Sequence, residues 1–296
     1  MPTSKTSRRD LLKTLAAGSL AASGIGSLAS FAKENKMKGL KGNINHSVCR
    51  WTFGKLSVAE LCIAVKKNGF SAIDLVGPKD WPVLKEHGVF SSMCNGAEIN
   101  LIDGWNEPKF HDTLIKNYTT HIELVAKAGY KNLICFSGNR RGMDDETGLQ
   151  NCVKGLQKIL PVAEKNNVIL VMELLNSKVN HKDYMCDKTP WGAELCKRLG
   201  SENFKLLYDI YHMQIDEGNV IQTIRDNRQY IAHYHTAGVP GRNEIDETQE
   251  LYYPAIMKAI TATGFKGYVA QEFIPTGKTN AEKLKALKEA VHICDV

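Results

Sequence analysis

One stretch shows how the chain is built: Tyr230-Ile-Ala-His-Tyr-His-Thr-Ala-Gly-Val-Pro-Gly-Arg-Asn-Glu-Ile-Asp246. Its first residues are β-branched and aromatic, which predicts a strand, and His235 stands where that run ends. The glycines and the proline that follow are turn residues and predict a loop. Arg242 comes next, and its planar guanidinium suits an anionic or polyhydroxyl ligand. A histidine at a strand end, followed by such a loop, indicates one wall of a binding site.

Three other apolar runs also end in a metal-type ligand, namely Glu173, Asp209 and Glu272. The run before Glu173, Val168-Ile-Leu-Val-Met172, is apolar at every position, as expected for a strand that helices cover on both faces. We therefore predict four strands that each end in an acid or a histidine. The rest of the chain is expected to support these four ends.

Strands and helices alternate along the chain. A capping box that begins at Ser57 starts the first helical stripe, and further helices are predicted over 110–128, 146–166 and 281–293. The predicted strands are 44–51, 72–76, 89–94, 132–136, 168–172, 204–208, 230–235 and 268–271. Such alternation predicts a parallel sheet, and eight units within ~250 residues predict a single (β/α)8 TIM barrel. An open doubly wound sheet is the alternative, but no Gly-x-Gly-x-x-Gly follows an early strand, as a dinucleotide site would require.

The first residues are predicted to lie outside the barrel. Arg8-Arg9 precedes a weakly apolar run rich in Ala, Gly and Ser, and Ser30-Phe31-Ala32 offers small residues to a signal peptidase. Residues 1–32 are therefore predicted to be a twin-arginine export signal, 33–42 a tether and 43–296 the catalytic domain. We expect export to the periplasm, or a cytoplasmic protein if the signal is not used. The apolar run is too short for a confident membrane span, so we expect no membrane attachment of the mature form.

Composition narrows the range of partners. The formal net charge is +6, and about half of it belongs to residues 1–32. The remaining charge is scattered, so nucleic acid is not predicted as a partner; a small-molecule substrate is, and a homo-oligomer is left open. The eight cysteines are dispersed without a Cys-x-x-Cys pair. They are interpreted as small core residues rather than as disulfide partners.

The four strand ends predict a metal site. Strand ends converge on one face of a (β/α)8 barrel, so Glu173, Asp209, His235 and Glu272 should crowd one half of that face. Three carboxylates so close together repel one another strongly unless a cation lies between them. Two Glu, one Asp and one His fit one divalent ion, either Mn²⁺, Mg²⁺, Co²⁺ or Zn²⁺. Ordinary ion pairs in loops are the alternative for any single acid, but four successive ends make that alternative weak.

Other polar residues lie near these ends in the sequence. His212 follows Asp209 by three residues, in the loop after the sixth strand, and could face the same ligand; a surface histidine is the alternative. Glu98 lies on the long loop after the third strand and is predicted to bind substrate. His233 precedes His235 by two residues, so the two point to the same side of a strand. One layer deeper, His233 is interpreted as a hydrogen-bonded core residue.

These residues carry a resemblance. The segments that carry it are Val171-Met-Glu-Leu-Leu-Asn176, Leu207-Tyr-Asp-Ile-Tyr-His-Met-Gln214, His235-Thr-Ala-Gly-Val-Pro-Gly-Arg242 and Gln271-Glu272. They resemble the xylose-isomerase-like superfamily of sugar isomerases and epimerases, and most of all its hydroxypyruvate isomerases. The resemblance implies that the four strand ends bind one divalent metal, that Glu173 and Glu272 transfer protons, and that His212 and Arg242 hold substrate oxygens.

Two features depart from the hydroxypyruvate isomerases. Those enzymes usually have Gln where this chain has His235, whereas the ketose 3-epimerases of the superfamily have His. The predicted export signal is the second departure, because both groups are mostly cytosolic. The departures bear on the substrate and leave the metal prediction in place.

The residue types favour proton transfer beside a carbonyl. A hydroxypyruvate/tartronate semialdehyde type of isomerisation through an enediolate needs a metal at the oxygens and carboxylates that move the proton. A ketose 3-epimerase needs the same groups. The other classes considered are a sugar dehydratase or hydrolase on the same barrel, including an endonuclease-IV-like phosphodiesterase, and a sugar-binding protein without catalysis. The nuclease would require more metal ligands and a basic face.

Overall fold

Eight parallel strands form the centre of the computed structural model, which describes residues 39–296. The strands are β1 Asn45–Val48, β2 Ala72–Val76, β3 Phe90–Cys94, β4 Asn132–Cys135, β5 Ile169–Glu173, β6 Phe204–Asp209, β7 Ile231–Thr236 and β8 Tyr268–Gln271. The predicted export signal and most of the predicted tether lie outside the described residues and stay predictions.

The sheet closes on itself. Its strand order is β1-β8-β7-β6-β5-β4-β3-β2, and every pair in that order is parallel. The two ends of this order meet through a parallel bridge between Cys49 and Asp74, and the Arg50 amide donates to the Asp74 carbonyl at 3.0 Å. The prediction of a single (β/α)8 barrel is thus confirmed, and the open doubly wound alternative is excluded.

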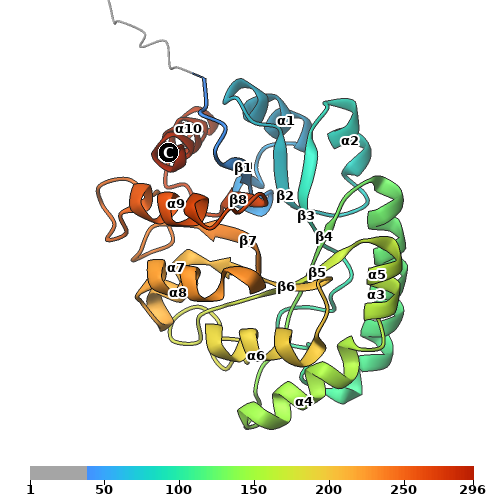
Figure 1. Cartoon of the computed structure of the whole chain (residues 1–296). Coiled ribbons are helices and arrows are strands. Elements are labelled where there is room, and N and C mark those ends of the chain that lie inside the picture. Colours follow the sequence, from blue (N-terminus) through green and yellow to red (C-terminus); the bar gives the residue numbers. More distant parts are fainter. Residues whose placement is uncertain (1–38) are drawn as a thin grey trace, which may run out of the picture. The chain divides into compact units, whose positions relative to one another are not determined.

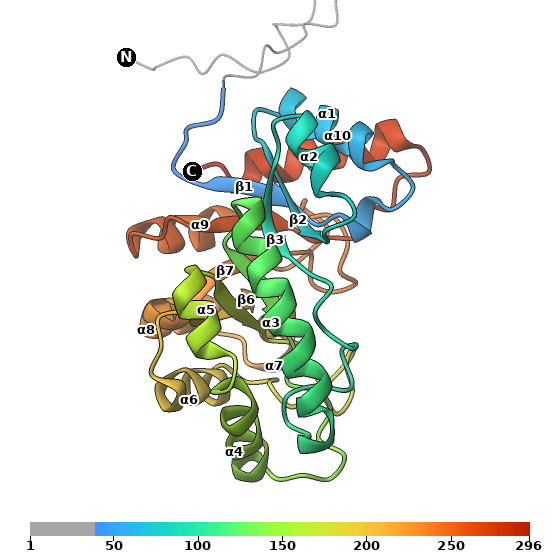
Figure 2. The same cartoon turned by 90° about the vertical axis from the view of Figure 1, so that its right-hand side faces the viewer.

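Helices surround the strands (Figure 1). They are α1 Val58–Lys67, α2 Trp81–Glu86, α3 His111–Ala128, α4 Asp145–Leu156, α5 Leu160–Asn166, α6 Thr189–Leu199, α7 Ile210–Asp216, α8 Val220–Asn227, α9 Tyr253–Ala262 and α10 Asn280–Cys294. The view turned by 90° shows α3 running along the outside of the strands (Figure 2). Among residues 39–296, no helix combines the length and the apolar character that a membrane crossing needs.

Local sequence explains where the helices begin and end. Ser57 accepts from the Glu60 amide, and the Glu60 side chain accepts from the Ser57 amide, so the predicted capping box at the start of α1 is present. The single helix predicted over 146–166 is wrong, because α4 and α5 are separate there. Pro161 lies in the first turn of α5. A proline has no N–H to donate to the preceding turn, and its ring clashes with that turn, so it favours a helix start over a continuous helix.

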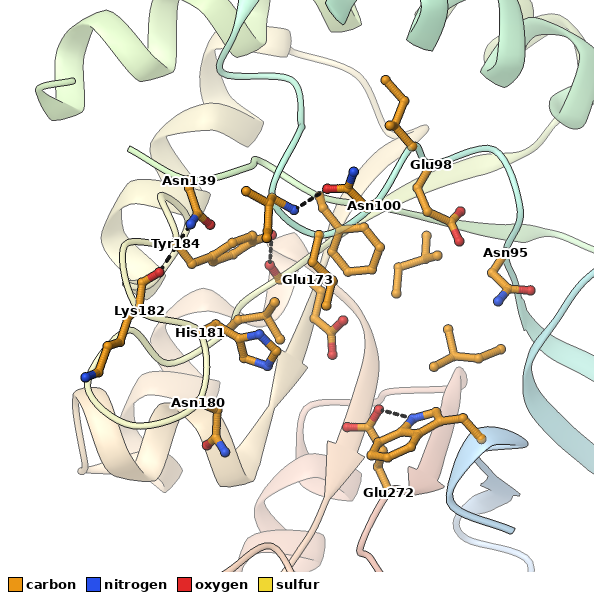
Figure 3. A pocket seen from close by; sticks show the side chains of 18 of the residues that line it. Asn95, Glu98, Asn100, Asn139, Glu173, Asn180, His181, Lys182, Tyr184 and Glu272 are labelled. Carbon is orange, nitrogen blue, oxygen red and sulfur yellow. Dashed lines mark hydrogen bonds between the residues drawn. The ribbon is translucent and has the colours of Figure 1, made fainter. Parts of the chain in front are cut away.

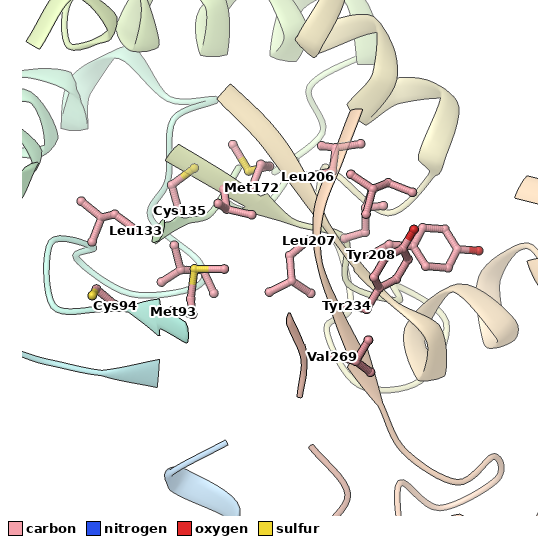
Figure 4. Packing of buried hydrophobic residues seen from close by; sticks show 14 of the residues in the cluster. Met93, Cys94, Leu133, Cys135, Met172, Leu206, Leu207, Tyr208, Tyr234 and Val269 are labelled. Carbon is pink, nitrogen blue, oxygen red and sulfur yellow. The ribbon is translucent and has the colours of Figure 1, made fainter. Parts of the chain in front are cut away.

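Apolar side chains from neighbouring strands pack together in a buried cluster (Figure 4). Met93, Leu133, Met172, Leu206 and Val269 come from five different strands and are fully buried. All eight cysteines are also buried, and each is a free thiol. Close packing of this kind holds the strand ends at fixed positions relative to one another.

The long loop between β3 and α3 is anchored to the end of β4. The Asn106 amide donates to the Ser137 carbonyl at 2.8 Å, and the Asn139 amide donates to the Ile102 carbonyl at 2.9 Å. Gly104 makes this contact possible, because a Cβ at this position would lie 2.4 Å from the backbone of Gly138. Backbone pairing therefore anchors the loop, and the Asn106 side chain adds a bond from Nδ2 to the Asn139 carbonyl at 2.6 Å.

Replacement of Gly104 by Ala should test this anchor. The added methyl meets rigid backbone, so we expect a loss near the upper end of the ~1–3 kcal/mol that overpacking usually costs. Urea unfolding measures the loss as a lower midpoint at an unchanged slope. Gly39→Ala is the matched control, since a Cβ there meets no atom of the described residues 39–296 within 4 Å. A Gly104→Ala variant as stable as the control would contradict the close approach.

Candidate active site

Four consecutive strands each bring one metal-type ligand to the same end of the barrel. Glu173 and Asp209 are the last residues of β5 and β6, His235 is the penultimate residue of β7, and Glu272 directly follows β8. Asp209 and His235 are register partners across the β6–β7 ladder. All four are buried, with 4% or less of each residue exposed. The structure therefore brings together the four residues that the sequence predicts as ligands.

The cluster is centred on one nitrogen of His235. Its Nδ1 lies 3.1 Å from Glu272 Oε2, 3.4 Å from Glu173 Oε1 and 3.9 Å from Asp209 Oδ2. One ligand atom from each of the four residues lies within 4.8 Å of the others. Among residues 39–296, Glu173 Oε1, Asp209 Oδ2 and His235 Nδ1 have no hydrogen-bond partner. Buried polar atoms are normally paired, so three such atoms aimed at one point fit a divalent cation with oxygen and nitrogen ligands.

Electrostatics support the same interpretation. Burial raises the pKa of Asp209 well above its usual value, and the charge of Glu272 raises it further. Burial also raises the pKa of Glu173. For Glu272 burial acts in the same direction, but the charges of Arg242 and His235 outweigh it and lower the pKa well below its usual value. A divalent cation among these residues would lower the pKa of all three carboxyl groups, because it favours the charged form of every carboxylate around it.

The two carboxylate oxygens of Asp209 have different roles, one as a helix cap and one in the cluster. Oδ1 accepts from the His212 amide at 3.1 Å and so caps the start of α7. Within the described part of the chain Oδ2 has no hydrogen-bond partner, and it faces His235. The change from strand to helix at this residue therefore fixes the orientation of the carboxylate.

His212 is buried beside the cluster rather than at the surface. The Asn176 side chain donates from Nδ2 to His212 Nδ1 at 2.6 Å. The orientation of that amide is set by its oxygen, which accepts from the amides of Val179 and Asn180. The proton of His212 is therefore on Nε2, which lies 3.7 Å from Asp209 Oδ2. Burial lowers the pKa of His212 well below its usual value, so a neutral imidazole presents an N–H donor to the site.

Arg242 lies over the cluster and pairs with protein carboxylates. Its guanidinium contacts Glu272 and lies 3.8 Å from Asp209 Oδ2. The Cζ atom of Arg242 also lies 5.1 Å from the centre of the Trp51 ring. The indole N–H of Trp51 donates to Glu272 Oε1 at 2.9 Å. The predicted contact of Arg242 with substrate oxygens stays a prediction, and a substrate at this place would meet a guanidinium already held in position.

A cavity of about 770 Å³ opens from the two glutamates. Figure 3 shows Glu98 on one side and His181 on the other, with Glu173 between them and Glu272 below. Glu98 is half-buried, accepts from the Gly96 amide at 2.8 Å and lines this cavity. The structure thus places Glu98 in the same cavity as the two glutamates, where it was predicted to bind substrate.

Sequence reasoning missed three residues of this region: Asp74, Trp51 and His181. Asp74 is fully buried and lies 3.1 Å from His235. A lone acid in the apolar run Ala72–Val76 was the available signal. Trp51 and His181 line the cavity, and no pattern in the sequence connects them with the strand ends. The interpretation of His233 as a core residue is confirmed by its complete burial. Its Nε2 lies 2.8 Å from Asp74 Oδ2, but among residues 39–296 neither ring nitrogen has a partner with hydrogen-bond geometry, so the predicted hydrogen bond is absent.

Eight parallel strands with a buried carboxylate–histidine cluster at their carboxyl ends define a TIM barrel with a candidate metal centre. Residues 63–290 match the model of the xylose isomerase-like TIM barrel family. The chain belongs to that family.

Several curated relatives are named as isomerases. A Xenopus laevis protein, provisionally named hydroxypyruvate isomerase, is 30% identical over 235 residues, or 73% of this chain and 84% of that protein. The 2-oxo-tetronate isomerase of Pectobacterium atrosepticum is 25% identical over 73% of this chain and 86% of its own. A Homo sapiens protein with the same provisional name as the frog protein is 29% identical over 127 residues. That match covers 43% of this chain and 46% of the human protein, so the chain spans about half the length of that relative.

Solved structures share the fold at lower identity. The D-psicose 3-epimerase of Clostridium cellulolyticum H10, solved with D-tagatose, has a TM-score of 0.71 at 17% identity and covers 85% of this chain and 98% of its own. The IolI protein, solved with a zinc atom, has a TM-score of 0.68 at 17% identity over the same shares of the two chains. At such identities the likeness shows the fold alone.

The metal site predicts one divalent ion per chain. Elemental analysis of purified protein should find it, and Asp209→Ala and His235→Ala should each lose it, because each removes one of four ligands. The ion should also raise the melting temperature, since it binds the folded state well and the unfolded state poorly. Chelation should therefore lower the melting temperature of the wild type and leave both variants unchanged. Stoichiometric metal in both variants would show that the four strand ends do not form the site.

Proposed function

We propose that the protein is a divalent-metal-dependent isomerase or epimerase that transfers a proton at the carbon beside a carbonyl. One observation carries the proposal: the two buried glutamates, Glu173 and Glu272, face the same cavity beside an aspartate and a histidine. The isomerase names of the curated relatives support the same reaction class.

The ligand set would be Glu173, Asp209, His235 and Glu272, in agreement with the unpaired atoms around His235 Nδ1. When bound, a divalent ion supplies a Lewis acid that stabilises negative charge on the carbonyl and the adjacent hydroxyl oxygen. The zinc of the IolI protein shows that a neighbour in this fold holds an ion. Which of Mn²⁺, Mg²⁺, Co²⁺ or Zn²⁺ this chain holds is left to the elemental analysis above.

The chain's own groups would move the proton. One glutamate removes it from the carbon beside the carbonyl, and either glutamate returns it to the neighbouring carbon or to the opposite face of the same carbon. The first outcome is isomerisation and the second epimerisation. The Nε2–H of His212 would donate to a substrate oxygen. Arg242, held by Glu272 and Trp51, would bind a carboxylate or hydroxyl groups at the cavity wall.

Two substrate types deserve to be tried first. Hydroxypyruvate and tartronate semialdehyde are suggested by the names of the relatives and by Arg242, whose forked guanidinium suits a small carboxylate. Ketohexoses are suggested by His235 and by the D-psicose 3-epimerase of Ruminiclostridium cellulolyticum, which is 26% identical over 191 residues. The cavity of about 770 Å³ favours the larger compound, because pockets of ~300–1,000 Å³ typically enclose ligands much bigger than a three-carbon acid.

The alternative classes have less support. A dehydratase or hydrolase on this barrel would use the same metal, so it remains the second candidate. A sugar-binding protein would have no need of two glutamates beside a metal. A nuclease would need a larger metal cluster and a basic face around it, whereas the wall of this cavity is largely apolar, with Leu75, Ile99, Leu101, Phe136 and Leu175.

We also propose that the protein is exported through its twin-arginine motif, Arg8-Arg9. Native protein from the cell envelope should then begin near Lys33, because Ser30-Phe31-Ala32 suits signal peptidase. N-terminal sequencing measures the start. An unprocessed chain confined to the cytosol would contradict export and leave the reaction untouched.

Deuterium exchange tests the reaction. Metal-loaded enzyme in deuterated water should introduce deuterium at the carbon beside the carbonyl of hydroxypyruvate or of a ketohexose, followed by NMR. Glu173→Gln and Glu272→Gln keep the side-chain shape and remove the base, so each should slow exchange on the order of 10²–10⁴-fold. The exposed Glu247 gives a matched control, since Glu247→Gln lies outside the cavity lining.

Two results would overturn the proposal. One is the absence of deuterium uptake with every hydroxy-carbonyl compound tried, which would move the assignment to the dehydratase or hydrolase. The other is uptake that stays at the wild-type rate in both glutamine variants. Metal content must be measured in each variant, because a variant that has lost its ion reports on binding rather than on proton transfer.

A further inference from the structure

A carboxylate lies beneath the candidate metal centre, in the interior of the barrel. Asp74 belongs to β2 and is fully buried. It contacts two histidines of β7, a strand that is not its neighbour in the sheet. The contact therefore crosses the barrel interior, and backbone pairing does not account for it.

Both oxygens of Asp74 are engaged. Oδ1 lies 3.1 Å from His235 Nε2 and accepts a weak contact from the Cys49 thiol at 3.7 Å. Oδ2 accepts from the Ser92 hydroxyl at 2.7 Å and lies 2.8 Å from His233 Nε2. Four groups thus converge on one carboxylate, and only His235 also belongs to the strand-end cluster.

The backbone of β2 is irregular where it presents this side chain. The pairing of β2 with β3 shifts register on both sides of Asp74. Leu75 has a φ of 55°, in the left-handed region that a branched side chain rarely adopts. Consecutive residues of a regular strand face opposite sides of the sheet, yet Asp74 reaches His235 while Leu75 lines the cavity. Because of this irregularity, two successive residues of β2 reach the site: Asp74 contacts His235, and Leu75 forms part of the cavity wall.

The contact determines which nitrogen of His235 carries a proton. An ionised carboxylate can only accept, so Nε2 must be the donor of the 3.1 Å hydrogen bond. In the neutral ring Nδ1 then has the lone pair, and Nδ1 is the atom that faces Glu173, Asp209 and Glu272. Histidines that bind metals typically donate their other ring N–H to such an acceptor.

We propose that Asp74 is a positioning residue for the metal centre: it holds the Nε2–H tautomer of His235 and so directs the Nδ1 lone pair at the ion. The inference rests on the proposed metal site and adds a residue from outside the four strand ends. Asp74 touches neither the cavity nor the other three ligands, so it acts through His235 alone.

Asp74→Asn tests the role, with Zn²⁺ as the probe. The amide keeps the size of the side chain but can donate to Nε2, which would move the ring proton to Nδ1 and block the ligand atom. We expect Zn²⁺ affinity, measured by competition with a chelating dye, to fall roughly 10–100-fold, the usual effect of losing such a partner. Ser92→Ala is the matched control, because it removes a partner of Asp74 Oδ2 without touching His235. Its affinity should stay within about threefold of the wild type, below the loss that removal of an outer-shell partner brings.

A second readout keeps the test decisive if the variant folds poorly. In wild-type protein loaded with Zn²⁺, long-range ¹H–¹⁵N spectra of labelled histidine should show His235 protonated at Nε2 and metal-bound at Nδ1, with His233→Gln used for assignment. A proton on Nδ1 would overturn the proposal, as would unchanged Zn²⁺ affinity in a folded Asp74→Asn variant or an equal loss in Ser92→Ala. If the wild type binds no Zn²⁺, Mn²⁺, Mg²⁺ or Co²⁺ at all, the metal centre itself is wrong and the role of Asp74 fails with it. Loss of exchange activity with metal binding intact would instead count against the reaction alone.

Discussion

The constraint on which the rest depends is the burial of three carboxylates around one imidazole nitrogen. Glu173, Asp209 and Glu272 all lie within 3.9 Å of His235 Nδ1, and each is at least 96% buried from solvent. Charges of one sign at such spacing are strongly unfavourable away from water. The protein offsets part of this cost with Arg242, which contacts Glu272 directly and lies close to Asp209. Arg242 supplies one positive charge against three carboxylates, and a neutral imidazole supplies none. A divalent ion would balance the remaining negative charge.

The barrel can hold such a cluster because the four groups lie on its most rigid part. They come from the ends of β5 to β8, whose ladders run without interruption up to the site, apart from one register shift at Leu206. Other residues of the cavity wall come instead from loops, including Glu98 and His181. Fixed ligands on strands and adaptable contacts on loops are the usual division in this fold, which allows the loops to change the substrate while the metal site stays in place.

Sequence alone predicted the strand ends well, because they follow from local patterns. An apolar run that ends in one ligand-type residue favours a strand end, and Glu173, Asp209, His235 and Glu272 all follow such runs. Asp74 could not be placed in the same way, since its contact with His235 joins strands that are far apart in the sheet. The same limit applies to Trp51, which begins the short 3₁₀ helix Trp51–Phe53, and to His181, which lies on a loop. The break between α4 and α5 had a local signal in Pro161, and the helical periodicity on either side of it concealed that signal.

The interior of the barrel below the site is not filled with apolar residues throughout, because it contains a series of hydrogen-bonded polar groups. Ser47 and Ser92 share a hydrogen bond at 2.6 Å, Ser92 donates to Asp74, and Asp74 accepts from His235. A buried series of polar groups is stable only when each group has a hydrogen-bond partner. A group without one loses its hydrogen bonds to water and gains none in the protein. The series of hydrogen bonds runs from Ser47 in β1 to His235 at the candidate metal centre. It therefore links the packing of the interior to the orientation of His235. On the outer face of the strands, Leu206 instead packs beneath Gly192 of α6, so the apolar layer between strands and helices supplies rigidity while the polar interior supplies orientation.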